Sequence, residues 1–168
     1  KYFFSLSYRA ISTYRLARRY GHIPLLKPFV RVIETRSKQL TGTEISPHAI
    51  IGERFTLPHP NGVVIGYGVE IDSDTTIFQQ VTLGAKRLGD WRTSGTNCYP
   101  KVGKRVTIYA GAKIVGAVTI GDDSQIGCNA VVLSDVPPGS VAVGNPARIL
   151  PGSTAGKAVA PSGKTLSS

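Results

Sequence analysis

The sequence predicts an all-β protein: a parallel β-helix of hexapeptide repeats, preceded by two short α-helices and interrupted by one loop excluded from the coil. Three observations predict this fold. An aliphatic residue recurs every six positions through the middle of the chain. Two segments with helical patterning, separated by Gly21 and Pro24, come before the repeat. The repeat then breaks over a polar, glycine-rich stretch. A period of six excludes an amphipathic helix, whose apolar stripe recurs at three and four.

The first element is a basic helical segment over residues 1–42. Helical patterning covers residues 5–20 and 24–40. Residues 1–40 contain nine Lys or Arg and one acid, Glu34, so they supply +8 of the net charge of +10. Such a concentration indicates an anionic partner, such as a membrane surface or an acidic or phosphorylated substrate; we do not expect a nucleic acid. A solvated helix face explains the charge equally well.

The second element is the repeat itself, over residues 43–150. Three hexads close one triangular coil, so residues about eighteen apart stack at the strand spacing of about 4.8 Å. We expect aliphatic side chains to fill the interior, and glycine to serve turns that need unusual backbone angles. The aliphatic series is Ile45, Ile51, Leu57, Ile65, Ile71, Ile77, Leu83, Val102, Ile108, Ile114, Ile120, Ile126 and Val132, and glycine follows it at Gly103, Gly121 and Gly127. The small or β-branched residues four positions later are Val69, Thr75, Val81, Val106, Ala112, Val118, Ser124, Ala130 and Val136.

The repeat is broken at two places. Its phase slips by two residues between Leu57 and Ile65, around His59. Farther on, residues 84–101 are polar, glycine-rich and too irregular for a coil, so we expect them to form the excluded loop. Residues 151–168 have the composition of a flexible tail. Solenoid proteins place function where the repeat is interrupted, so both breaks are candidate sites.

Composition limits the remaining possibilities. No apolar run approaches the ~18 residues of a membrane helix. The two cysteines, Cys98 and Cys128, imply no disulfide framework and have no metal-ligand spacing. With only His48 and His59 in the coils, we expect no metal site. These features predict a cytoplasmic protein, with contact at the inner face of the membrane as an option left open by the basic segment.

Several stretches resemble serine acetyltransferases and their hexapeptide-repeat acyltransferase relatives. They are "YRLARRY", "TGTEISPHAIIGERFTLPHPNGVVIG", "TIFQQVTLG", "YAGAKIVGAVTIG" and "PPGSVAVGNPARIL". The resemblance covers about residues 14–150. It implies a left-handed β-helix that assembles as a homotrimer. It also implies acetyl transfer from acetyl-CoA to a hydroxyl, with the cofactor in a groove between neighbouring subunits.

His59 matches the catalytic histidine of this family. A neutral hydroxyl is a poor nucleophile toward a thioester, so the reaction needs a general base, and the flanking Pro58 and Pro60 stiffen the backbone that presents the imidazole. The alternative is a surface histidine in a turn. Glu44 occupies the position of an aspartate that orients the histidine in the family, and its alternative is a solvated charge at the start of the first coil. His48 and His22 match no catalytic position.

The resemblance also implies a set of cofactor contacts. The family binds pantetheine largely through backbone groups, which Gly84, Ala110 and Gly111 would supply here. Small residues at these positions would let the pantetheine arm approach the coil edge, although a structural role for the glycines is equally natural. The basic side chains of Lys113 and Arg148 are candidates for neutralising the CoA phosphates.

The serine-binding residues of the family are missing. The family has an aspartate before the catalytic histidine and an Arg-His-Pro in the loop, whereas this chain has Pro58 and Cys98-Tyr99-Pro100. We therefore expect a saccharide acceptor in exopolysaccharide or capsule synthesis, with Trp91 and Tyr99 as aromatic surfaces on which a sugar stacks. The alternative within enzymes is serine O-acetyltransferase of cysteine biosynthesis. A non-enzymatic alternative is a basic adaptor that binds membrane or nucleic acid.

Overall fold

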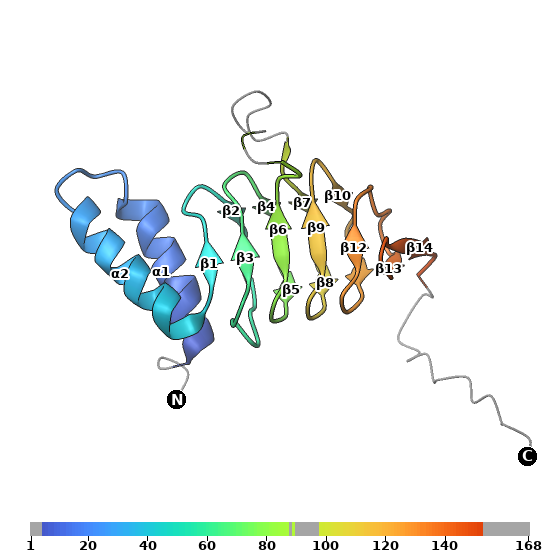
Figure 1. Cartoon of the computed structure of the whole chain (residues 1–168), viewed down its shortest axis with the longest axis horizontal. Helices are drawn as coiled ribbons and strands as arrows, with labels where there is room; N and C mark the ends of the chain where they lie inside the picture. Colours follow the sequence, from blue (N-terminus) through green and yellow to red (C-terminus); the bar gives the residue numbers. More distant parts are fainter. Residues whose placement is uncertain (1–4, 88, 90–97, 153–168) are drawn as a thin grey trace, which may run out of the picture.

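Three sheets of short parallel strands wind around one another as the faces of a left-handed β-helix, as the repeat and the family resemblance predicted (Figure 1). The structure, a computed structural model, describes residues 5–87, 89 and 98–152. The first sheet contains β1 (Glu44–Ile45), β3 (Val64–Ile65), β6 (Thr82–Gly84), β9 (Lys113–Val115) and β12 (Val131–Val132). The second contains β2 (Ile50–Ile51), β4 (Glu70–Ile71), β7 (Lys101–Val102) and β10 (Thr119–Ile120). The third contains β5 (Thr76–Ile77), β8 (Thr107–Ile108), β11 (Gln125–Ile126), β13 (Val141–Val143) and the antiparallel β14 (Arg148–Leu150).

The strand register locates both interruptions of the repeat. In the regular part Val102 pairs with Ile120, eighteen residues on. Ile45 instead pairs with Ile65, twenty residues on, so the two extra residues fall in the corner that contains His59. Leu83 pairs with Ile114 because the chain between β6 and β7 leaves the coil before it returns. Of that excluded segment, residues 88 and 90–97 lie outside the described part of the chain.

The predicted interior positions form the core. From Ile65 to Val132 the aliphatic series is buried throughout, and the small positions beside it are buried as well. Two of those small residues are polar, and each finds a partner. The Thr75 hydroxyl donates to the Gly103 carbonyl at 3.1 Å, and the Ser124 hydroxyl donates to the Pro137 carbonyl at 2.9 Å. The core therefore tolerates hydroxyls because neighbouring coils satisfy them.

The predicted role of the hexad glycines was wrong. The backbone at Gly103, Gly121 and Gly127 is not left-handed. These glycines are needed because the next coil passes too close for a side chain; a Cβ at Gly121 would lie 2.4 Å from the Pro138 nitrogen. Several left-handed corner positions are taken by other residues: Arg54, Asp74, Gln80, Arg105, Asp123 and Asn129.

Alternating charges stack along one of these corners. An Arg54 Nη2 donates to Asp74 Oδ2 at 2.7 Å, and Arg105 Nη2 donates to Asp123 Oδ2 at 2.7 Å. These hydrogen bonds lower the pKa values of the Asp74 and Asp123 carboxyls. The pairs are exposed, so we assign them a role in ordering the corner rather than a large share of stability.

Two helices, α1 (Leu6–Tyr20) and α2 (Lys27–Thr41), lie at one end of the row of coils (Figure 1). Ser5 caps α1 by accepting a hydrogen bond from the Tyr8 N–H at 3.1 Å, and Gly42 ends α2 in the left-handed region at φ 65°. The buried face of α1 consists of Ala10, Tyr14 and Ala17. No helix among the described residues is both long enough and apolar enough to cross a bilayer.

Helix α1 satisfies carbonyl groups at the open edge of the first coil. Tyr14 Oη and Arg18 Nη1 each donate to the Ala49 carbonyl at 2.7 Å, and Arg15 Nη2 donates to the Gly52 carbonyl at 3.1 Å. Burial raises the pKa of the Tyr14 hydroxyl, which favours its donating form. Part of the basic charge of the N-terminal segment thus serves to dock the helix, because the first coil has no preceding coil to donate to it.

Candidate active site

His59 lies in the corner that joins the third sheet to the first, where the repeat gains two residues. Leu57 and Pro60 are buried on either side of it, whereas Pro58 and His59 are exposed. The corner is fixed to the residue before β1, because the buried Thr43 hydroxyl donates to the Pro60 carbonyl at 2.6 Å. The His59 imidazole makes no hydrogen bond to another described residue. The phase slip therefore produces an anchored bulge that presents an exposed imidazole.

An aromatic ladder continues from His59 along the same corner of the next coils. The His59 and Phe78 ring centroids are 6.5 Å apart, and Phe78 stacks on Tyr109 at 5.5 Å with an interplanar angle of 16°. Both aromatic residues are half-buried. The sequence analysis missed them, although each directly follows an aliphatic core position, in the turn that corresponds to that of His59. They form one wall beside the imidazole.

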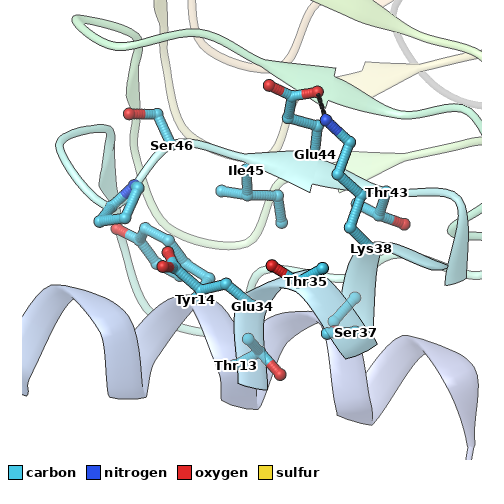
Figure 2. A pocket seen from close by; sticks show the side chains of 12 residues that line it. Thr13, Tyr14, Glu34, Thr35, Ser37, Lys38, Thr43, Glu44, Ile45 and Ser46 are labelled. Atoms are coloured by element: carbon cyan, nitrogen blue, oxygen red, sulfur yellow. Dashed lines mark hydrogen bonds and ion pairs between the residues drawn. The ribbon is translucent and has the colours of Figure 1, made fainter. Parts of the chain in front are cut away.

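The structure gives Glu44 a different partner from the predicted one. The Glu44 carboxylate projects from β1 and accepts a hydrogen bond from the Lys38 ammonium of α2 (Figure 2). Both side chains stand at the edge of a cavity of about 310 Å³ between the two helices and β1. His59 does not line this cavity. In this arrangement the Glu44 carboxylate forms neither a hydrogen bond nor an ion pair with the His59 imidazole that it was expected to orient.

The predicted cofactor residues fall into two groups according to the sheet on which they lie. Gly84 on β6 and Lys113 on β9 lie on the same sheet as Glu44, and Ala110 and Gly111 form the turn that enters β9. Arg148 lies on β14, in the third sheet, so the structure does not place it on the sheet that carries Gly84 and Lys113.

The two glycines of this set differ in what the fold requires. Gly111 has a φ of +76°, and a Cβ there would lie 2.0 Å from Asn129 Oδ1, so the coil itself needs glycine. A Cβ at Gly84 would meet no described atom within 4 Å. The Lys113 ammonium donates to the Gln80 carbonyl and therefore already has a partner within the coil. The described fold does not itself require a glycine at Gly84. A ligand or a neighbouring subunit that approaches this position would explain why the residue has no side chain.

Comparisons with known proteins agree with this architecture. The bacterial transferase hexapeptide (six repeats) family matches residues 99–134. The serine acetyltransferase of Helicobacter pylori is 43% identical over 146 residues, which cover 84% of this chain and 79% of the relative. The chain belongs to the serine acetyltransferase family. It is also similar to the solved serine acetyltransferase of Brucella abortus in complex with coenzyme A, with a TM-score of 0.79, 34% identity, and coverage of 89% of this chain and 57% of that one. The soybean serine acetyltransferase complexed with serine gives a TM-score of 0.73 and 35% identity, over 84% of this chain and 56% of that one. The chain thus spans little more than half the length of these solved members of the serine acetyltransferase family.

The segment that replaces the family's Arg-His-Pro is part of the core. Cys98, Tyr99 and Pro100 are all buried, and a Cβ at Gly66 would lie 3.0 Å from the Tyr99 ring. The expectation that Tyr99 offers a free aromatic face to a sugar is wrong, because its ring packs against Gly66 on the neighbouring coil. Trp91, the other expected aromatic surface, lies outside the described residues.

The described residues contain no group of three or more His, Cys, Asp or Glu side chains that could hold a metal ion. His48 is exposed, and its ring stacks on that of Tyr67 with 4.3 Å between the ring centroids.

Proposed function

We propose that this chain is an acetyl-CoA-dependent O-acetyltransferase with His59 as its general base. The observation that carries the proposal is the exposed imidazole at the anchored break of the coil, in a chain whose relatives are serine acetyltransferases. One of those relatives was solved with coenzyme A. If the chain were only a basic adaptor, the exposure of His59 at the break of the coil would serve no function.

The reaction follows from the properties of an imidazole. A neutral imidazole accepts the proton of the acceptor hydroxyl while the oxygen attacks the thioester carbonyl. When the carbon–sulfur bond breaks, the imidazolium returns that proton to the departing thiolate, so that ester and CoA thiol are formed without net change in the enzyme. Acetyl-CoA supplies the activated acetyl group. Gly84 and the backbone of Ala110 and Gly111 would hold its pantetheine arm.

For the acceptor, the comparisons favour the alternative of the sequence analysis over its first choice. The relatives are named serine acetyltransferases, and the soybean protein was solved with serine. We therefore propose L-serine as the first acceptor. A saccharide remains the second candidate because of one specific observation: the residue before His59 is the uncharged Pro58, and Cys98 and Tyr99 are buried where the family has charged handles.

Acceptor identity is tested by measuring the release of CoA thiol from acetyl-CoA. We expect saturable turnover with L-serine that exceeds hydrolysis without an acceptor. Turnover with a sugar or oligosaccharide and none with serine would transfer the proposal to the second candidate. If neither class raises thiol release above that of a His59→Ala variant, the O-acetyltransferase proposal itself is contradicted.

Glu44 is proposed as a positioning residue for His59, although in this structure its carboxylate binds Lys38. Glu44→Gln should lower kcat by about tenfold, less than loss of the base itself. Lys38→Gln is the control, since it breaks the same ion pair but keeps the carboxylate. Equal kcat values in both variants would show that Glu44 serves only the ion pair with α2.

We further propose that the chain forms a homotrimer, as the family resemblance implies. The open space at Gly84, on an outer face of the coil, is where a groove between subunits would need a residue without a side chain. Light scattering should give a mass three times that of the chain. An active monomer would refute the trimer.

A further inference from the structure

Helix α2 carries an apolar stripe on the face that is turned away from its buried side. The exposed fraction is 81% for Leu25, 70% for Phe29, 60% for Val32 and 53% for Leu40. Helical spacing places Phe29, Val32, Ile33 and Leu40 on one side of α2, and Leu25 lies in the turn just before the helix. The buried residues of α2 are Val30, Ser37 and Thr41. We call Leu25, Phe29, Val32, Ile33 and Leu40 the outer stripe. An apolar face of this extent on an end helix indicates an interaction surface (Figure 1).

Of two nearby arginines, Arg36 lies within the outer stripe by helical spacing, whereas Arg31 lies on the opposite flank of α2 and also lines a groove with Glu34, Pro47 and His48. Arg31 and Arg36 line a groove of about 270 Å³ together with Val32, Thr35 and Gln39. Neither guanidinium forms a hydrogen bond or an ion pair with another described residue, although Arg31 acts on Glu34 through its charge. This distinguishes them from Arg15, Arg18 and Lys38, which bind the first coil and Glu44. Glu34, the one acid of residues 1–40, lies on the side that lines the cavity of Figure 2.

The combination of apolar and basic character selects the partner. A second copy of the chain would bring two segments of +8 charge against each other. A nucleic acid would match the arginines but offers no apolar layer for Phe29 and Leu25. An anionic phospholipid bilayer matches both, since amphipathic helices rest with their apolar face at the acyl boundary and their Arg side chains among the phosphates.

We propose that α2 docks on the surface of an anionic phospholipid membrane. The outer stripe enters the headgroup and acyl boundary, and Arg36 binds a lipid phosphate. This is a peripheral contact and leaves the coils outside the bilayer. It rests on the surface of α2 and does not depend on the proposed acetyl transfer.

The full chain should co-sediment with vesicles that mix phosphatidylcholine with phosphatidylglycerol, and much less with phosphatidylcholine alone. High salt should weaken the binding, because the arginine contacts are screened. Phe29→Glu should lower the partition coefficient by about tenfold. Leu133→Glu is the matched control, because Leu133 is an exposed apolar residue of the coil and the change in charge is the same. Arg36→Gln should lower binding about fivefold, and Arg31→Gln should lower it less.

Three outcomes would overturn the proposal. The wild-type chain fails to bind anionic vesicles, or Phe29→Glu binds them as well as Leu133→Glu does. The third outcome is a change in the oligomeric mass of Phe29→Glu, measured by light scattering without lipid. That change would mean that another copy of the chain covers the outer stripe. CoA release with a water-soluble acceptor should be the same for Phe29→Glu and the wild type. Failure of membrane binding and failure of acetyl transfer are therefore separate results.

Discussion

Replacing His59 with alanine should lower kcat for acetyl transfer by about 10²- to 10⁴-fold, the usual contribution of a general base. The fold should survive, because the His59 side chain is exposed and makes no hydrogen bond within the described residues. The corner is anchored instead by the buried Leu57 and Pro60. The measurement is thiol release at saturating acetyl-CoA, with a circular dichroism spectrum to check the coil.

His48→Ala is the control for this experiment. His48 is also an exposed histidine of the first coil, and its ring is stacked on Tyr67. It should keep nearly full activity, because it is not in the corner where the repeat slips. A His59→Ala variant that turns over at the rate of His48→Ala would remove His59 from the mechanism and with it the proposed function.

Replacing Ile108 with alanine should destabilise the folded chain by about 2–5 kcal/mol. Ile108 lies on β8, between β5 and β11 of the third sheet, and its exposed fraction is 0%. Coils above and below restrict the collapse of the cavity, so the cost includes both lost burial and empty volume. The thermal midpoint should fall by roughly 5–20 °C for a chain of this size.

Ile50→Ala makes the same chemical change at an outward position. Ile50 lies on β2 and is 52% exposed, so we expect only a small shift in its midpoint. Both variants should be measured at one protein concentration, because association would couple to the midpoint. Equal shifts in the two variants would mean that the inward series does not form the core.

The sequence by itself determined the coil, its core and the position of the general-base candidate. A parallel β-helix is a one-dimensional repeat, in which each hexad meets the same neighbours as the hexad before it. The inward positions could therefore be read from periodicity alone, and residues such as Ile114 and Val132 are buried as expected. The slip around His59 was visible for the same reason, because an insertion changes the phase of everything that follows. The register of Ile45 with Ile65 now shows it in space.

Only the tertiary structure decided which side chains meet across elements. Glu44 pairs with Lys38 because α2 folds back beside β1, which no repeat period encodes. Tyr99 is buried because the returning loop lays its ring against Gly66 on an earlier coil. Gly121 is required by the close passage of Pro138, whereas sequence alone suggested a special backbone angle. In each case the contact depends on packing between segments that are distant in sequence. A local sequence pattern carries no information about which distant segments pack together.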